Sequence, residues 1–241
     1  MNSRQLFDPR SSSYSYLLWD AGTREAALID PVRDRVVRDI HLLRELGLRL
    51  RYTLETHLHA DHITGSGLLR KTLDSMVLVH ENCGVKCPDI LLKDGDCIPL
   101  GGEKIGVIHT PGHTACDVSY AIPGRVFTGD TLLIGGCGRT DLQSGNAGIL
   151  YDSITKRLFS LPDDTLVYPG HDYHGRSYSS IGAEKVHNLR IGYDIERGEF
   201  IKVMDSLQLD PPQCIHEALP SNLRCGIPAH ENTAHAVCTG Y

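Results

Sequence analysis

The sequence predicts an α/β protein in which helices lie outside stacked β-sheets. Strand and helix patterns alternate in the first and last thirds of the chain, and the middle third is rich in strand patterns. Hydrophobic residues make up 41% and charged residues 22% of the 241 residues, which is ordinary for a globular protein with its own core. Because the chain contains no internal repeat or flexible linker, we expect one domain over residues 1–241. Residues from about 178 onward then form an integral C-terminal extension.

Each predicted element has its own local signal. The strands are β-branched, aliphatic or aromatic runs that end at Gly, Pro or Asp. The helices carry apolar residues at helical spacing, and Gly47 stands where the first helix is expected to end. In chain order, the pattern predicts strands over residues 14–20 and 25–31, a helix over 34–46, a strand over 51–55, a helix over 64–73, strands over 76–80, 104–110, 118–122 and 125–128, a helix over 150–161, a strand over 165–168 and a helix over 199–207.

Charge, hydropathy and cysteine usage exclude several classes of protein. The net charge of −6, with scattered lysines and arginines, argues against a nucleic-acid partner. No run approaches the roughly 18 apolar residues of a membrane span, so no membrane partner is expected. The eight cysteines lack the dense spacing of a secreted scaffold, and the first twenty residues show no signal-peptide pattern. We therefore expect a cytoplasmic protein with free thiols.

Histidine and aspartate side chains collect where predicted strands end. The members of this set are His57, His59, Asp61 and His62 after the strand 51–55, His113 after 104–110, Asp130 after 125–128, and His171 after 165–168. A single histidine after a strand is usually a polar loop residue. Seven metal-ligating side chains at four strand ends are much harder to explain in that way, and their nitrogen and oxygen atoms are ligands that suit zinc or ferrous iron. The sequence therefore predicts a metal site.

The segment 56–62 (THLHADH), together with His113, Asp130 and His171, resembles the motif of the metallo-β-lactamase superfamily. The resemblance extends over about residues 14–174 and implies a four-layer αββα sandwich. It does not select a reaction, because the superfamily includes hydrolases, nucleases, oxidoreductases and dioxygenases.

Further segments resemble the persulfide dioxygenases of the ethylmalonic-encephalopathy protein type. They are 55–67 (ETHLHADHITGSG), 127–133 (FTGDTLL), 135–141 (GGCGRTD), 169–175 (PGHDYHG) and 218–226 (ALPSNLRCG). Enzymes of this family oxidise glutathione persulfide with O₂ and water to glutathione and sulfite. Glyoxalase II shares the Gly-Cys-Gly-Arg core, but it continues with aromatic and acidic residues and has a longer C-terminal domain.

The resemblance to these dioxygenases implies a role for each residue. His57, His113 and Asp130 would bind one Fe²⁺ per chain, a ligand set that leaves positions open for O₂ and a substrate sulfur. Arg139 would anchor a glutathione carboxylate, because a guanidinium binds carboxylates in a two-pronged fork. Tyr173 and Cys225 would contact the substrate. The remaining four residues would orient ligands and hold water: His59, Asp61, His62 and His171.

Several alternatives stay open at this point. A hydrolase of glutathione thioesters, like glyoxalase II, would hold two metals, with Asp130 bridging them and Asp61, His62 and His171 completing the second site. A sensor would bind iron and persulfide without turnover. Arg139 could form a surface ion pair and Tyr173 a buried ring. A homodimer is also open, since dimers are common in the persulfide dioxygenase family.

Two other cysteine patterns carry less information. Cys137, like Cys225, could be a small buried apolar residue, which is the commoner fate of a free cysteine. Cys83 and Cys87 have the spacing of half a zinc site, but no matching second pair follows, and we expect no structural zinc there.

Overall fold

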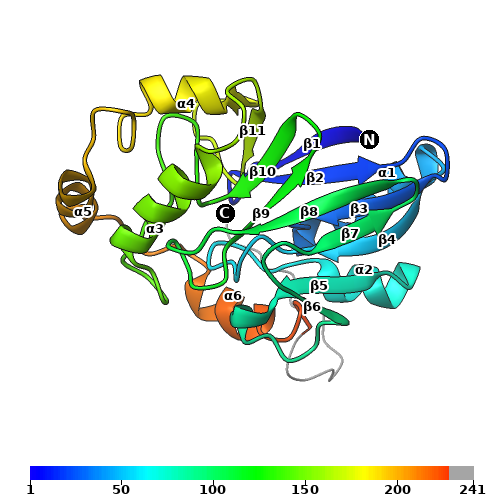
Figure 1. Ribbon diagram of the computed structural model, residues 1–241. Helices are drawn as coiled ribbons and strands as arrows, with labels where there is room; N and C mark the ends of the chain where they lie inside the picture. The colour runs from blue at the N-terminus through cyan, green and yellow to red at the C-terminus, as the bar shows by residue number, and fades with distance from the viewer. Residues whose placement is uncertain (228–241) are drawn as a thin grey trace.

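Two six-stranded sheets face each other in the computed structural model, which describes residues 1–227. Helices cover the outer face of each sheet, so the layers run helix, sheet, sheet, helix (Figure 1). This four-layer αββα sandwich confirms the predicted fold class. None of the helices within the described residues is long and apolar enough to cross a membrane.

The first sheet has both antiparallel and parallel pairs. In spatial order its strands are β1 (Asn2–Asp8), β2 (Ser13–Trp19), β3 (Glu25–Ile29), β4 (Arg49–Leu54), β5 (Met76–His80) and β6 (Ile90–Leu92). Strands β1 to β3 are antiparallel, whereas β3 to β6 are parallel. Because parallel strands end at the same edge of a sheet, the residues that follow β3 and β4 are brought together.

The second sheet is mostly antiparallel. In spatial order its strands are β12 (Ser179–Ser180), β11 (Leu166–Pro169), β10 (Arg125–Gly129), β9 (Val118–Ile122), β8 (Glu103–His109) and β7 (Cys97–Leu100). Its one parallel pair is β10 with β11. That pair brings the residues after β10 and β11 to one edge, which is where Asp130 and His171 lie.

Six α-helices complete the described chain. They are α1 (Val36–Glu45), α2 (Ser66–Leu73), α3 (Ala147–Ser153), α4 (Ile181–His187), α5 (Arg197–Asp205) and α6 (Ile215–Asn222). A π-helical turn, Ile154–Leu158, continues α3, and 3₁₀ turns occur at Arg33–Arg35 and Glu81–Cys83. Gly47 follows α1 with a φ of 59°, the left-handed conformation that its predicted position after the helix requires.

The alternation of side chains along each strand divides the core into layers. In β2, Tyr14, Tyr16 and Leu18 point between the two sheets, whereas Leu17 points toward the outer helices α1 and α2. A third apolar layer fills the space between the second sheet and α3, α4 and α5. Since both faces of the central strands are buried, strand register is strongly specified in this fold.

All predicted strands and helices are present, with ends shifted by a few residues. The sequence did not predict β1, β6, β7, β12, α4 or α6. Strand β1 begins with the polar run Asn-Ser-Arg-Gln and lies at the edge of its sheet, where polar residues are common. The predicted extension contains α4, α5 and α6, and its part beyond residue 227 lies outside the described residues.

Candidate metal centre

Loops at one edge of the two sheets bring the predicted metal-ligating residues together. The ligand atoms of His57, His113 and Asp130 lie within 4.8 Å of one another. Those of His59, Asp61 and His62 form a second group with the same spread. Six of the seven predicted residues thus form two groups, and His171 belongs to neither of them.

His171 lies between the two groups. Its Nε2 atom is 3.6 Å from Asp130 Oδ2 and also 3.6 Å from Asp61 Oδ2. Asp130 Oδ2 in turn lies 3.7 Å from His113 Nε2. Asp130 therefore lies next to His113 of the first group and to His171, which in turn lies next to Asp61 of the second group.

Backbone carbonyls select the tautomers of two of these histidines. His113 Nδ1 donates to the carbonyl of Arg139 at 2.7 Å, and His171 Nδ1 donates to that of Ser12 at 3.1 Å. Because a carbonyl only accepts hydrogen bonds, the proton lies on Nδ1 in each ring. In the neutral ring each Nε2 keeps its lone pair for a cation. Burial alone would lower the pKa of His171, but the nearby Asp130 and Asp61 carboxylates outweigh that effect and raise it.

A buried chain of hydrogen bonds has the same effect on His57. The Thr56 hydroxyl donates to Asp30 Oδ2 at 2.7 Å, so at 3.0 Å it accepts from His57 Nδ1. Burial holds the pKa of His57 well below its usual value, and the neighbouring His59 and His113 lower it further. His57 is therefore neutral, which is the form that binds metals.

His59 has different surroundings. Its Nε2 lies 3.1 Å from Asp30 Oδ1 and 3.4 Å from Glu55 Oε2. Burial alone would lower the pKa of His59, but these two carboxylates outweigh that effect and raise it well above the usual value. In this arrangement His59 is not part of the group formed by His57, His113 and Asp130.

Several buried polar atoms of the site have no hydrogen-bond partner. They are Asp130 Oδ1, His62 Nε2 and His59 Nδ1. An unpartnered buried polar atom is costly, and a bound cation would compensate Asp130 Oδ1 and His62 Nε2. The backbone also packs closely here, since a β-carbon at Gly170 would lie 2.5 Å from Asp130 Oδ1. The residues present therefore fit a metal ion.

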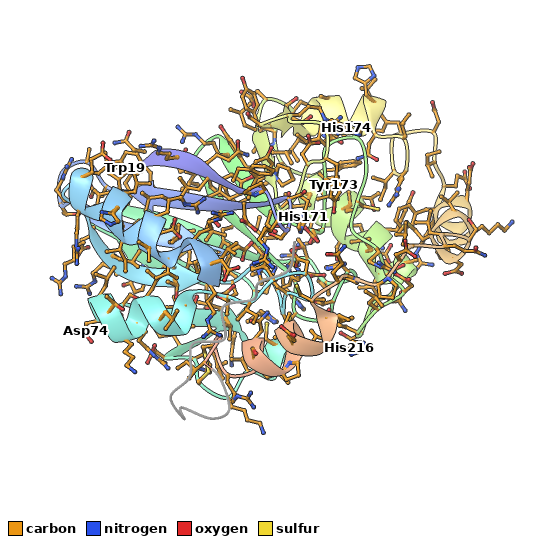
Figure 2. The ribbon with its side chains drawn as sticks, turned by 180° about the vertical axis from the view of Figure 1, so that it is seen from behind. Trp19, Asp74, His171, Tyr173, His174 and His216 are labelled. Atoms are coloured by element: carbon orange, nitrogen blue, oxygen red, sulfur yellow. A yellow bond between two sulfur atoms is a disulfide. The ribbon has the colours of Figure 1, made fainter. Side chains whose placement is uncertain are left out.

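A cavity of about 1830 Å³ opens over the site. Tyr173 lies at this cavity, with its ring parallel to that of His171 and the ring centroids 6.0 Å apart. The two side chains lie beside each other near the centre of the view in Figure 2, far from Trp19 and Asp74. Tyr173 is 73% exposed, so the alternative of a buried ring is wrong.

Arg139 also lines the cavity, but its guanidinium group is already engaged. Nε and one terminal nitrogen each donate to a different carboxylate oxygen of Asp141, both at 2.7 Å. The remaining contacts are to the carbonyls of Asp210 at 2.7 Å and Leu209 at 3.0 Å. Arg139 thus links the glycine-rich loop to the segment before α6. A substrate carboxylate could bind the same two guanidinium nitrogens only by replacing Asp141.

The expectation of free thiols is wrong for two cysteines, because Cys87 and Cys225 form a disulfide. Cys225 is only 2% exposed and does not line the metal-facing cavity. Its predicted contact with substrate is therefore incorrect, since its sulfur is both bonded and buried. Cys137 is a buried thiol, and burial raises its pKa to about 11, as for an unreactive apolar residue. Within residues 1–227, Cys83 and Cys87 belong to no metal-ligating group.

Asn222 of α6 holds the metal-site loop, a role that we did not predict. Its side-chain amide donates to the carbonyls of His59 at 2.9 Å and His62 at 2.8 Å, and its oxygen accepts from the backbone N–H of Thr64 at 2.9 Å. Ser13 was also missed, and its hydroxyl donates to Asp61 Oδ2 at 2.9 Å. Both residues lie far along the chain from the loop that they contact, so no local pattern marks them.

Comparison with known proteins places this geometry in a family. Residues 8–171 match the family model described as the metallo-beta-lactamase superfamily. The chain belongs to the metallo-beta-lactamase superfamily. The matched span includes His57, His113, Asp130 and His171.

Within this superfamily the chain is similar to persulfide dioxygenases. It is 48% identical to the mitochondrial persulfide dioxygenase ETHE1 of Bos taurus, over 93% of this chain and 88% of that protein. The crystal structure of ETHE1 from Myxococcus xanthus matches with a TM-score of 0.92 and 50% identity, over 94% of this chain and all of that one. A hydroxyacylglutathione hydrolase of Synechococcus is 34% identical, over 78% of this chain and 71% of that protein.

Proposed function

We propose that this chain is a persulfide dioxygenase, which oxidises glutathione persulfide with O₂ and water to glutathione and sulfite. The observation that carries the proposal is the group of His57, His113 and Asp130 in a chain that is 48–50% identical to persulfide dioxygenases. The similarity extends over more than nine-tenths of this chain, and the hydrolase relative is more distant. The persulfide's terminal sulfur takes up both oxygen atoms of O₂ and one from water, and the glutathione thiol is released.

We further propose that His57, His113 and Asp130 hold one ferrous ion. Two imidazoles and one carboxylate are a ligand set typical of non-haem iron enzymes that use O₂, and they leave positions for O₂ and a substrate sulfur. Bound iron would mediate electron transfer from the persulfide sulfur, which is oxidised, to O₂. The carbonyls of Arg139 and Ser12 keep the rings of His113 and His171 in place, and Asp61 and His62 line the adjacent side of the site.

Tyr173 and Arg139 are the proposed contacts for the glutathione part of the substrate. Both line the cavity within which His57, His113 and Asp130 lie, and Tyr173 is largely exposed there. Asp172, beside Tyr173, accepts hydrogen bonds from the backbone of His174 and Arg176, so the loop that carries the tyrosine is fixed. A cytoplasmic location and a homodimer stay predictions.

Replacing Arg139 with alanine is expected to raise KM for glutathione persulfide about tenfold, with a smaller change in kcat. This is roughly the effect of removing one charged hydrogen-bond donor from a substrate carboxylate. The measurement is steady-state kinetics of sulfite formation, with Arg44→Ala on the exposed face of α1 as the matched control. If both constants stay at their wild-type values, Arg139 serves only to join the glycine-rich loop to Leu209 and Asp210.

A two-metal hydrolase of glutathione thioesters is the second candidate, because one observation favours it. His59, Asp61 and His62 form their own ligand-type group, and His171 lies equally close to Asp61 and Asp130. Elemental analysis of metal-loaded protein, with a parallel assay of lactoylglutathione cleavage, separates the two functions. We expect one iron per chain and no thioester cleavage. Two metals per chain with thioester turnover would replace the dioxygenase by the hydrolase.

A sensor without catalysis is distinguished by turnover. Such a protein would bind iron and persulfide but form no sulfite. We expect many sulfite molecules per chain, because the ligand group is complete and open to the cavity.

A further inference from the structure

The disulfide between Cys87 and Cys225 joins two segments that are 138 residues apart in sequence. Cys87 follows the 3₁₀ turn at the end of β5, and Cys225 follows α6. The backbone N–H of Lys86 also donates to the carbonyl of Leu223 at 3.1 Å. A covalent bond and a hydrogen bond therefore hold the α6 segment against the first sheet.

The same α6 segment holds the loop of the metal centre. Asn222 makes three hydrogen bonds to the loop, and the carbonyl of Cys225 accepts from the backbone N–H of Gly67 at 2.9 Å. Cys225 itself has a φ of 55°, a left-handed conformation that is unfavourable for a residue with a β-carbon. The surrounding contacts must therefore maintain this turn, and the disulfide is the strongest of them.

The disulfide has one accessible side and one buried side. Cys87 is half-buried, whereas Cys225 is buried in an apolar cluster with Val77 and Val79. Leu58, which lies between two histidines of the metal loop, packs against the same cluster. Arg70 donates to the carbonyl of Cys87 at 2.7 Å and also pairs with Asp89 at 3.4 Å, so a cation whose charge Asp89 partly balances lies near the accessible cysteine. Nearby positive charge attracts an incoming thiolate and stabilises the thiolate form of a cysteine.

We propose that the Cys87–Cys225 disulfide is a site of exchange with small thiols, and that its redox state sets how firmly α6 holds the metal-site loop. A thiolate attacks Cys87 Sγ, the bond to Cys225 breaks, and Cys225 leaves as a thiolate. A second thiolate attacks the mixed disulfide, so that Cys87 is released as a thiolate and the two small thiols leave as their own disulfide. The small disulfide is the oxidant for the reverse reaction. This inference goes beyond the proposed dioxygenase activity and does not depend on it.

Metal-free protein equilibrated with glutathione disulfide or with glutathione provides the test. After thiol blocking and digestion without reductant, we expect a peptide containing Cys87 joined to one containing Cys225 in the oxidised sample, and its loss in the reduced one. Amide hydrogen exchange of residues 59–67 should be several-fold faster after reduction, because the loop opens more often. Cys87→Ser should exchange at the fast rate in both buffers, and Cys97→Ser, at an exposed free cysteine, should behave as wild type.

Two results would overturn the proposal. One is the absence of the joined peptide from the oxidised wild-type protein. The other is a joined peptide with equal exchange of residues 59–67 in both redox buffers, which would leave the disulfide without influence on the loop. Both results come from the wild-type chain, so they stand even where the Cys87→Ser variant does not fold. Neither depends on iron or on turnover.

Discussion

Replacing Asp130 with alanine is expected to abolish metal binding and, with it, all dioxygenase activity. Asp130 Oδ2 lies within 4 Å of both His113 and His171, and Oδ1 is buried without a hydrogen-bond partner. The variant removes the only carboxylate of the group that contains His57 and His113. Loss of a residue that merely orients a ligand costs about 10–100-fold in metal affinity, so loss of the ligand itself should cost more than about 100-fold.

The measurement is the iron content and iron dissociation constant of the purified variant. The matched control is Asp205→Ala, which removes an exposed carboxylate from α5, far along the chain from the ligand loops. The control should bind one iron per chain with wild-type affinity. An Asp130→Ala protein that retains a full complement of tightly bound iron would show that the metal is held elsewhere.

Replacing Asn222 with alanine is expected to lower the free energy of unfolding by about 3 kcal/mol or more. The variant leaves the carbonyls of His59 and His62 and the backbone N–H of Thr64 without partners, and each unsatisfied group costs about 1–3 kcal/mol. Asn222 is 4% exposed, so water does not readily replace the lost bonds. For a chain of this size the loss lowers Tm by about 6–12 °C. Thermal unfolding of the metal-free protein provides the measurement.

Asn82→Ala is the matched control, since Asn82 is exposed and contributes only its backbone N–H to a hydrogen bond. Its Tm should stay within a degree or two of wild type, as for most surface substitutions. An Asn222→Ala protein with unchanged Tm would mean that the loop is held by its other contacts, and the role assigned to α6 would have to be withdrawn.

The fold could be predicted because its signals are local. Apolar alternation marks the buried strands, and helical spacing marks α1 and α5. Strand β1 gave no such signal, since its first residues are polar and its pairing depends on β2. The short strands β6 and β7 likewise depend on their neighbours more than on their own composition.

The candidate site could be predicted in part for a related reason. Every metal-type residue lies in a loop that follows a strand, and strands that end at one edge bring such loops together. The groups that orient them could not be predicted in this way. Asn222 lies more than 150 residues from the loop that it holds. Asp30 directly follows β3, but only the parallel pairing with β4 reveals that it contacts Thr56.

The disulfide is a further feature that depends on three-dimensional structure. Cys87 and Cys225 have no spacing that marks them as a pair, and eight cysteines allow many pairings. The hydrogen-bond partners of Arg139 could not be predicted for the same reason. Leu209 and Asp210 are 70 and 71 residues away in sequence, and only the fold brings the segment after α5 next to Arg139.

The most direct test of the proposed function is O₂ uptake by protein loaded with ferrous iron under anaerobic conditions, on addition of glutathione persulfide, with sulfite assayed in the same sample. We predict that one O₂ is consumed for each sulfite formed, and that neither change occurs in Asp130→Ala. Absence of O₂ uptake by wild-type protein with iron confirmed in the site would contradict this prediction, and would favour the two-metal thioester hydrolase.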